Sequence, residues 1–227
     1  MAEPTPSADR RPAPGYLSGQ RVEAFSDGVI AIAITLLVLD LTVPTHEEAA
    51  ARGLGRALLD RWPSYFAYLV SFLVIGIIWV NHHAVFARVR QVDRPVLFAN
   101  LALLLSISVL PFPTRVLAEY LTAGNDSHIA AAVYSASMLA MGLTYALLWI
   151  VVTRDAELLH KAADRAASRA ALRRFGLGNV FYLLTIGLSF VSALLTLAVH
   201  AALGVYYCFD QLATPAVQEA HRPGSDR

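Results

Sequence analysis

The sequence predicts an all-α membrane protein whose chain crosses the bilayer six times. Of its 227 residues, 56% are hydrophobic and only 15% are charged, and the mean hydropathy of +0.52 lies well above that of a typical soluble domain. Several apolar stretches reach the roughly 20 residues that a helix needs to cross a hydrocarbon core about 30 Å thick. Basic residues concentrate in alternate connections between these stretches, which is typical of a polytopic membrane protein.

The expected spans follow from the apolar stretches in chain order. The last stretch, residues 177–209, is too long for one span, because about 33 residues rise roughly 50 Å in a helix. We therefore expect two short helices there with a turn near His200, which gives six spans, or five if the stretch is continuous. The first four predicted spans are residues 22–43, 65–80, 96–117 and 129–152.

The regions outside the spans differ in composition. Residues 1–20 are polar and proline-rich, which predicts a disordered tail and not a cleaved signal peptide. Residues 21–212 form the expected membrane domain, and residues 213–227 a second tail. Inside the domain, residues 155–174 are rich in alanine and charge and predict a helical linker. Cys208 is the only cysteine, so a disulfide framework within one chain is excluded.

The distribution of basic residues predicts the orientation, because cytoplasmic flanks keep an excess of Lys and Arg. With six spans, both tails and the second and fourth connections share one side, which carries most of the basic residues. We therefore expect both termini in the cytoplasm and the chain in the cell (inner) membrane. The opposite side carries only Arg52, Arg56, Arg61 and Arg115.

Polar residues near the start of the first span are the first candidate site. Asp27 lies in an apolar run, where a carboxylate is costly unless it is paired, so it is a functional candidate by default. The prediction favours a hydrogen-bonded set of Asp27, His82 or His83, and Asn100 that locks the first helix to its neighbours. A proton relay is the alternative. A metal site is disfavoured because adjacent histidines point about 100° apart on a helix.

A stripe of side chains on the first span is the second candidate site. The helical i, i+3, i+4, i+7 spacing is followed by Ile32, Thr35, Leu36 and Leu39. Around the helix, Asp27 points about 140° away from Ile32. Such a stripe lines a pore, packs against other helices or contacts lipid, and periodicity alone favours packing or lipid. Asp40, at the far end of the span, is either an ion-attracting acid or an interfacial residue.

Other functions find little support in the sequence. We find no nucleophile with a base, no phosphate-binding loop and no paired carboxylates on one helix face, so an enzyme is not expected. The net charge of +1 gives no reason to expect nucleic acid as a partner. No metal or other cofactor is predicted. Because no internal repeat is visible, a symmetric pore requires several copies of the chain.

The residues from Arg21 through Phe25-Ser26-Asp27 into GVIAIAITLLVLDL resemble the transmembrane protein 175 family of potassium channels, whose hallmark is RxxxFSD at the start of the first helix. The likeness continues in the second and third spans. The resemblance implies six helices per repeat and, for a single-repeat bacterial chain, a homotetramer in the lipid bilayer with a pore made by four first helices. The further matching positions are Trp79, His82, His83, Asn100-Leu101 and Pro111-Phe112.

The resemblance also implies roles for individual residues. By spacing from the motif, Ile32, Leu36 and Leu39 would form the apolar constriction, and Thr35 would contribute to the preference for K+. The expected function is a potassium-selective leak channel with K+ as the permeant ion. The alternative is a proton-permeable channel or a proton-coupled transporter that uses Asp27 and His82 or His83. Residues expected to brace the pore from behind are Arg21, Phe25, Ser26, Asp27, Trp79, His82, His83 and Asn100.

Overall fold

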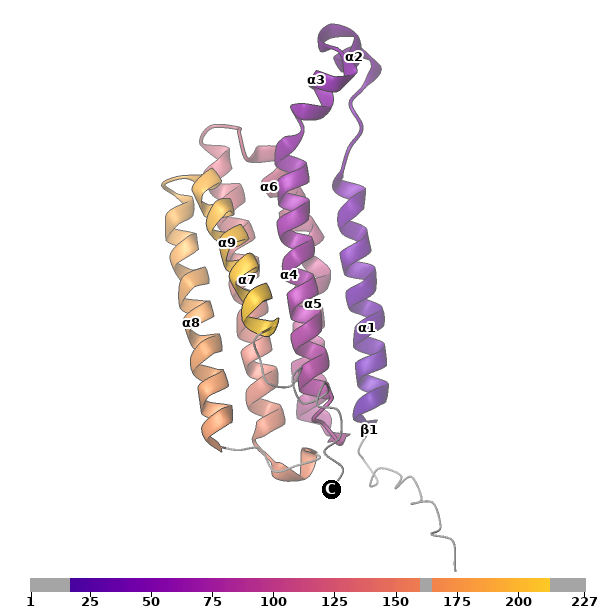
Figure 1. The fold of residues 1–227 in the computed structure, drawn as a ribbon, viewed down its shortest axis with the longest axis vertical. Helices are drawn as coiled ribbons and strands as arrows, with labels where there is room; N and C mark the ends of the chain where they lie inside the picture. Colours follow the sequence, from indigo (N-terminus) through magenta and orange to yellow (C-terminus); the bar gives the residue numbers. More distant parts are fainter. Residues whose placement is uncertain (1–16, 160–164, 213–227) are drawn as a thin grey trace, which may run out of the picture.

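The chain folds into a bundle of long helices that stand side by side (Figure 1). The computed structural model describes residues 17–159 and 165–212, so the predicted tail of residues 213–227 and most of the predicted tail of residues 1–20 lie outside the described residues. The long helices are α1 (Gly19–Leu36), α4 (Trp62–Phe86), α5 (Arg94–Val109), α7 (Asp126–Thr153), α8 (Arg165–Ser189) and α9 (Ala193–Leu212). The short elements are β1 (Leu17–Ser18), η1 (Leu37–Asp40), α2 (His46–Arg52), α3 (Leu54–Leu59), β2 (Gln91–Val92), α6 (Pro111–Tyr120) and η2 (Ala156–Leu158).

Four helical stretches of the described chain are long and apolar enough to cross a membrane, which confirms an all-α protein with several candidate spans. Two further helices, α8 and α9, contain shorter apolar stretches, Gly176–Ser189 and Ala193–Cys208. The four candidate spans are Gly19–Asp40, Trp62–Phe86, Arg94–Tyr120 and Asp126–Thr153.

The predicted turn near His200 is wrong. The chain reverses at residues 190–192, between α8 and α9, where the amides of Phe190 and Val191 donate to carbonyls three residues back. His200 lies inside α9 with 1% of its surface exposed, and its Nε2 is 2.9 Å from Ser135 Oγ. A polar residue in an apolar run therefore marks a buried hydrogen bond here, and not a helix end.

The predicted third span, residues 96–117, is divided into α5 and α6 at Leu110. Proline has no amide hydrogen, so Pro111 cannot continue the ladder of helical hydrogen bonds, although it suits the first turn of a new helix. The amide of Leu110 accordingly donates to Ile107, three residues back, at 3.1 Å. Both helices pack on α7, while α5 also contacts α1 and α6 mainly contacts α4.

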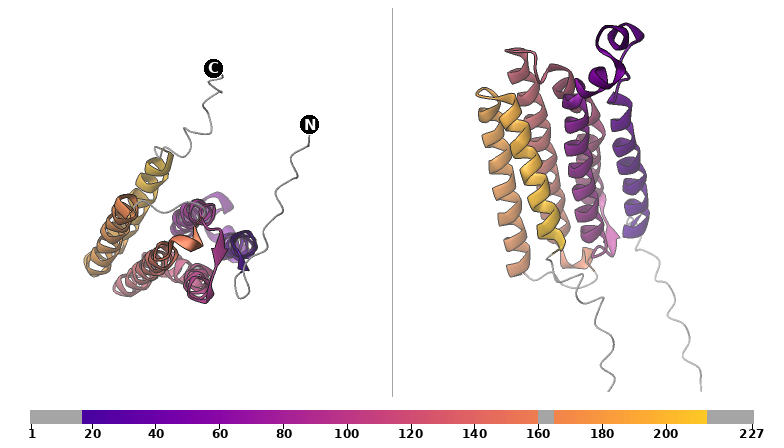
Figure 2. Two further views of the ribbon diagram at one scale, coloured as in Figure 1. Left: turned by 90° about the horizontal axis from the view of Figure 1, so that it is seen from below. Right: turned by 45° about the horizontal axis from the view of Figure 1, so that its top comes forward.

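α7 forms the centre of the bundle and α1 lies at its edge. α7 contacts α5, α6, α8 and α9, and its Tyr134 and Met138 are fully buried in the hydrophobic core. α1 contacts α4 and α5 on one side only. Seen from below, α1 stands at one edge of the molecule, and α8 and α9 at the other (Figure 2).

The two ends of the bundle differ. One end, called here the strand end, carries the antiparallel pair β1 and β2, with Leu17 opposite Val92 and Ser18 opposite Gln91. A bridge from Val89 to Leu159 joins the α4–α5 connection to the segment after α7 at the same end. The other end, called here the cap end, carries α2 and α3 between α1 and α4 (Figure 1). The connections with many basic residues thus share the strand end.

Candidate functional site

α1 has one face buried in the bundle. Every third or fourth side chain along the helix is buried, which is the pattern of an amphipathic helix packed on one side. This face packs against α4 and α5. Its members are Val22, Ser26, Ile30 and Ala33, followed by Leu37 in η1.

The opposite face of α1 carries the stripe that the sequence singles out. Ile32 is 61% exposed, Leu36 42% and Leu39 70%, and Thr35 is exposed as well. The Thr35 hydroxyl donates to the Ile32 carbonyl at 2.8 Å, which leaves its lone pairs free to accept from outside the helix. Packing within this chain therefore does not account for the stripe. Its side chains face lipid, water or another copy of the chain.

The end of α1 changes geometry and aligns the stripe. η1 is a 3-10 helix, in which side chains three residues apart lie directly above one another. Leu39 therefore stands above Leu36 instead of about 60° to one side, as a continuous α-helix would place it.

In Asp40, Oδ2 is buried and makes no hydrogen bond with the described residues.

A buried chain of hydrogen bonds joins α1 to α5 and α4. Ser26 Oγ donates to the Val22 carbonyl at 2.8 Å and accepts from Asn100 Nδ2 at 2.9 Å. Asn100 Oδ1 accepts from His82 Nε2 at 2.9 Å, and the His82 ring stacks on Phe86 with 4.4 Å between centroids. All three linked residues are at most 1% exposed. Because an amide group both donates and accepts, Asn100 is the centre of this chain.

A second set of contacts joins α1 to α4 nearer the surface. Trp79 Nε1 donates to Asp27 Oδ1 at 2.9 Å, and His83 Nδ1 lies 2.7 Å from Glu23 Oε1. The two partners on each helix are four residues apart, so they lie on one helical face and form two rungs between antiparallel helices. Glu23 was not among the predicted site residues, although its spacing of four from Asp27 matches that between Trp79 and His83.

The predicted pairing of Asp27 with His82 or His83 and Asn100 is therefore wrong. Asp27 pairs with Trp79, His83 pairs with Glu23, and His82 belongs to the separate Ser26–Asn100 chain. The reason is orientation, since adjacent histidines on a helix must face different neighbours.

Arg21 and Phe25 are not part of either set. Arg21 is exposed and forms no ion pair or hydrogen bond with the residues that the structure describes. Phe25 is 56% exposed and lies within about 20° of Ile32 around the helix, so it does not stand behind the stripe within this chain. Their predicted bracing role would require contacts outside the single chain.

The described part of the chain offers no obvious place for a metal ion. Nowhere in residues 17–159 and 165–212 do three side chains of the His, Cys, Asp or Glu type come together as ligands. The chemistry of the site is instead an apolar, exposed stripe on a helix whose other face is fixed by buried hydrogen bonds.

Residues 21–111 match the family model described as "Endosomal/lysosomal potassium channel TMEM175". This segment begins at Arg21 and includes α1, the cap and the whole set of contacts around Asn100. A potassium channel of Streptomyces collinus is 54% identical over 200 residues, which cover 88% of this chain and 96% of that protein. A potassium channel of Chamaesiphon minutus is 41% identical over 195 residues, 86% of this chain and 96% of that protein.

A solved structure is also similar over most of its length. The crystal structure of a lysosomal potassium-selective channel TMEM175 homolog from Chamaesiphon minutus matches with a TM-score of 0.78 and 39% sequence identity. The match covers 86% of this chain and 98% of that one.

Proposed function

The chain belongs to the TMEM175 family of potassium channels, and from this premise we propose that it conducts K+ across a membrane through a pore lined by α1. The observation that carries the proposal is the exposed stripe of Ile32, Thr35, Leu36 and Leu39 on a helix whose opposite face is buried. An apolar stripe held in place in this way is suited to form a narrow, gated passage.

The proposed assembly is a homotetramer with four α1 helices around a central axis. The position of α1 at the edge of the bundle supports this assembly, because the stripe is then free to face the same axis in every copy. We further propose six spans, with α8 and α9 crossing the membrane beside the four longer stretches. In the cell (inner) membrane, the strand end would face the cytoplasm, as its basic residues favour.

Selectivity in this proposal comes from a partly dehydrating neck. The sequence has no TVGYG segment to supply a filter of backbone carbonyls. Rings of Ile32, Leu36 and Leu39 would admit an ion only with part of its water removed, which penalises Na+ because Na+ holds water more tightly than K+. Four Thr35 hydroxyls would replace some of the lost water. The channel would be of the leak type, since no apolar stretch carries the regularly repeated arginines of a voltage sensor. The arginines of α8 precede its apolar stretch, Gly176–Ser189.

Proton conduction through Asp27 and the histidines receives no support from the contacts. Asp27 accepts from the Trp79 indole, which is a donor only and cannot accept a proton to pass it on, and His82 bonds to an amide. The described hydrogen bonds therefore do not link Asp27 to His82 or His83.

The experiment that tests the proposal is the reversal potential of purified protein in planar bilayers under opposed K+ and Na+ gradients, and then under a pH gradient at equal K+. We expect a reversal potential that follows the K+ gradient and does not move with pH. A reversal potential that follows pH would establish proton conduction instead, and absence of current in protein of tetrameric mass would contradict a channel.

A further inference from the structure

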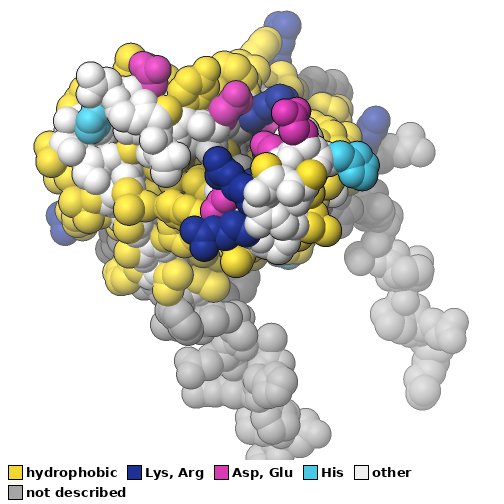
Figure 3. Space-filling model, turned by 90° about the horizontal axis from the view of Figure 1, so that it is seen from above, with side chains coloured by type: hydrophobic (Ala, Val, Ile, Leu, Met, Phe, Trp, Pro, Cys, Tyr) yellow, Lys and Arg dark blue, Asp and Glu magenta, His cyan; other side chains and the backbone are white. Residues whose placement is uncertain are grey.

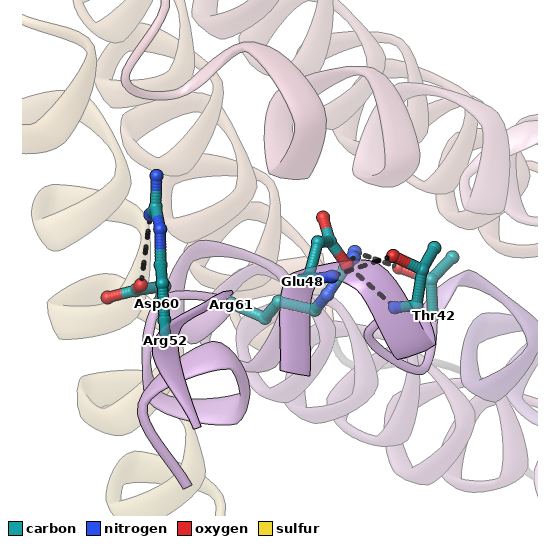
Figure 4. Close-up of polar contacts among 6 residues, drawn as sticks. Thr42, Glu48, Arg52, Asp60 and Arg61 are labelled. Carbon is teal, nitrogen blue, oxygen red and sulfur yellow. Dashed lines mark hydrogen bonds and ion pairs between the residues drawn. The ribbon is translucent and has the colours of Figure 1, made fainter. Parts of the chain in front are cut away.

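The side chain of Arg61 links the cap formed by α2 and α3 to the segment that follows η1. Figure 4 shows Arg61, at the start of α4, lying between Glu48 of α2 and Thr42, which follows η1. Arg61 Nη1 donates to Thr42 Oγ1 at 2.5 Å, and Nη2 donates to Glu48 Oε2 at 2.9 Å. One guanidinium group thus joins three segments that are separate in the sequence.

Glu48 is itself held in place by the start of its own helix. Thr45 and Glu48 form a capping box, in which Thr45 Oγ1 accepts from the Glu48 amide at 3.2 Å and Glu48 Oε2 accepts from the Thr45 amide at 2.7 Å. The Thr45 amide and Arg61 lower the pKa of Glu48 below its ordinary value, because both stabilise the carboxylate. The contact with Arg61 is therefore kept at neutral pH and lost only as the pH falls through this lowered pKa.

The other charged contacts of the cap have a different character. Arg52 and Arg56 both approach Asp60, at 3.5 and 3.4 Å, with side chains 70% and 73% exposed. The Arg61 side chain is only 26% exposed. Figure 3 looks onto the cap end, where acidic and basic side chains gather within a surface that is largely hydrophobic. Exposed pairs contribute little to stability, and Glu48 is itself 50% exposed. What sets Arg61 apart is that its less exposed guanidinium group reaches two acceptors, Thr42 and Glu48, at shorter distances.

The position of Thr42 gives this contact a consequence for the stripe. Thr42 lies three residues after Leu39, and Leu39 and Val38 are exposed on η1. Within η1, Leu37 is fully buried and fixes one end of this short helix. The hydroxyl of Thr42 fixes the chain on the other side of Leu39.

We propose that Arg61 is a positioning residue for ion conduction, which holds the Leu39 ring at the outer end of the pore by clasping Thr42 to the cap. The proposal rests on the proposed channel function. Because a lysine has a single ammonium group where arginine has a planar fork, Arg61→Lys would keep a charge near Glu48 but would not reach both acceptors in the same way.

The test compares single-channel recordings of Arg61→Gln, Arg61→Lys and Thr42→Val with the wild type in symmetric KCl. The matched control is Arg56→Gln, the same change on the same cap. Without the clasp, η1 has more conformations, so we expect open probability to fall about two- to fivefold in Arg61→Gln and Thr42→Val, in line with the usual strength of partly exposed charged contacts. Arg61→Lys should restore part of the loss, and Arg56→Gln should match the wild type.

Coupling within the clasp is tested by the double variant Arg61→Gln/Thr42→Val, which should be no worse than Arg61→Gln alone. Unchanged or raised open probability in Arg61→Gln, or additive losses in the double variant, would overturn the proposal.

Amide hydrogen exchange separates failure of the clasp from failure of the channel function. Exchange in residues 41–48 should be faster in Arg61→Gln than in Arg56→Gln, whether or not the protein conducts. If exchange is faster in Arg61→Gln but even the wild type carries no current, the role of Arg61 in holding this segment stands and the channel function fails. Equal exchange in the two variants would show that Arg61 does not hold this segment.

Discussion

At the scale of single residues, the bracing of α1 depends most on Asn100. Its amide donates to Ser26 and accepts from His82, and each of these residues comes from a different helix. A buried polar group that loses its partner still carries the desolvation penalty, and no hydrogen bond offsets it. A short buried chain of this kind fixes both the rotation and the height of α1.

We predict that Asn100→Ala destabilises the protein by about 1–3 kcal/mol, because it leaves His82 Nε2 buried without a partner. Asn125→Ala is the matched control, since Asn125 is exposed and its side chain does not cap α7. Thermal unfolding in detergent, followed by tryptophan fluorescence, measures both variants. Equal transition temperatures for the two would show that the Asn100 contacts do not stabilise the fold.

At the scale of elements, the strand end holds the beginning of α1 against the α4–α5 connection. A methyl group placed on Gly19 would lie 2.5 Å from the Val89 carbonyl oxygen, which is backbone and cannot turn aside. Val89 also pairs with Leu159, and the Arg90 amide donates to the Leu158 carbonyl at 2.8 Å. Gly19 is therefore required for the close approach of α1 to this connection.

The substitution Gly19→Ala should cost about 1–3 kcal/mol, the usual range for an overpacked contact. Gly187→Ala is its control, because nothing lies within 4 Å of the added methyl group on α8. An alanine at that helical position should leave stability unchanged or raise it by up to about 1 kcal/mol. The temperature at which each variant loses its gel-filtration peak gives the comparison, and a Gly19→Ala variant as stable as the wild type would refute the close contact.

The sequence predicted the main helices because their apolar length is a local property. It also placed the stripe on one face, since helical spacing puts Ile32 and Leu36 on one side whatever the surroundings. Periodicity alone did not show that this face is exposed. It did not predict the division of the third span at Leu110, although Pro111 is a signal for a helix boundary. Nor did it predict the reversal at residues 190–192. In the latter case the polar His200 suggests a turn, whereas the structure buries it in the core with Nε2 bonded to Ser135.

The pairings within the site could not be predicted because they depend on the rotation of one helix against another. Asp27 was correctly identified as needing a partner, but whether Trp79 or a histidine reaches it is decided by the packing of α1 on α4. Glu23 gave no signal by itself, because an acidic residue in the first turns of a helix is common at the surface.

At the scale of the whole molecule, the bundle leaves one face of α1 uncovered. α1 is anchored through one face to α4 and α5 and presents the other outward. A single chain gains nothing from an exposed stripe with a hydroxyl among bulky apolar side chains, whereas four copies around an axis enclose a passage with that lining. The proposed function therefore depends on the outward face of α1, one of the helices at an edge of the bundle.

The claim that α1 lines the pore is tested most directly by the K+/Na+ reversal potential and conductance of the wild type and Ile32→Asn in bilayers. Ile129→Asn is the control, because Ile129 on α7 is exposed to the same extent, 62% against 61%. We expect the wild type to prefer K+ and Ile129→Asn to behave as the wild type. Ile32→Asn should conduct more with less selectivity, because polar side chains keep the neck wet. If Ile32→Asn left both quantities unchanged, or altered them no more than Ile129→Asn, α1 would not line the pore.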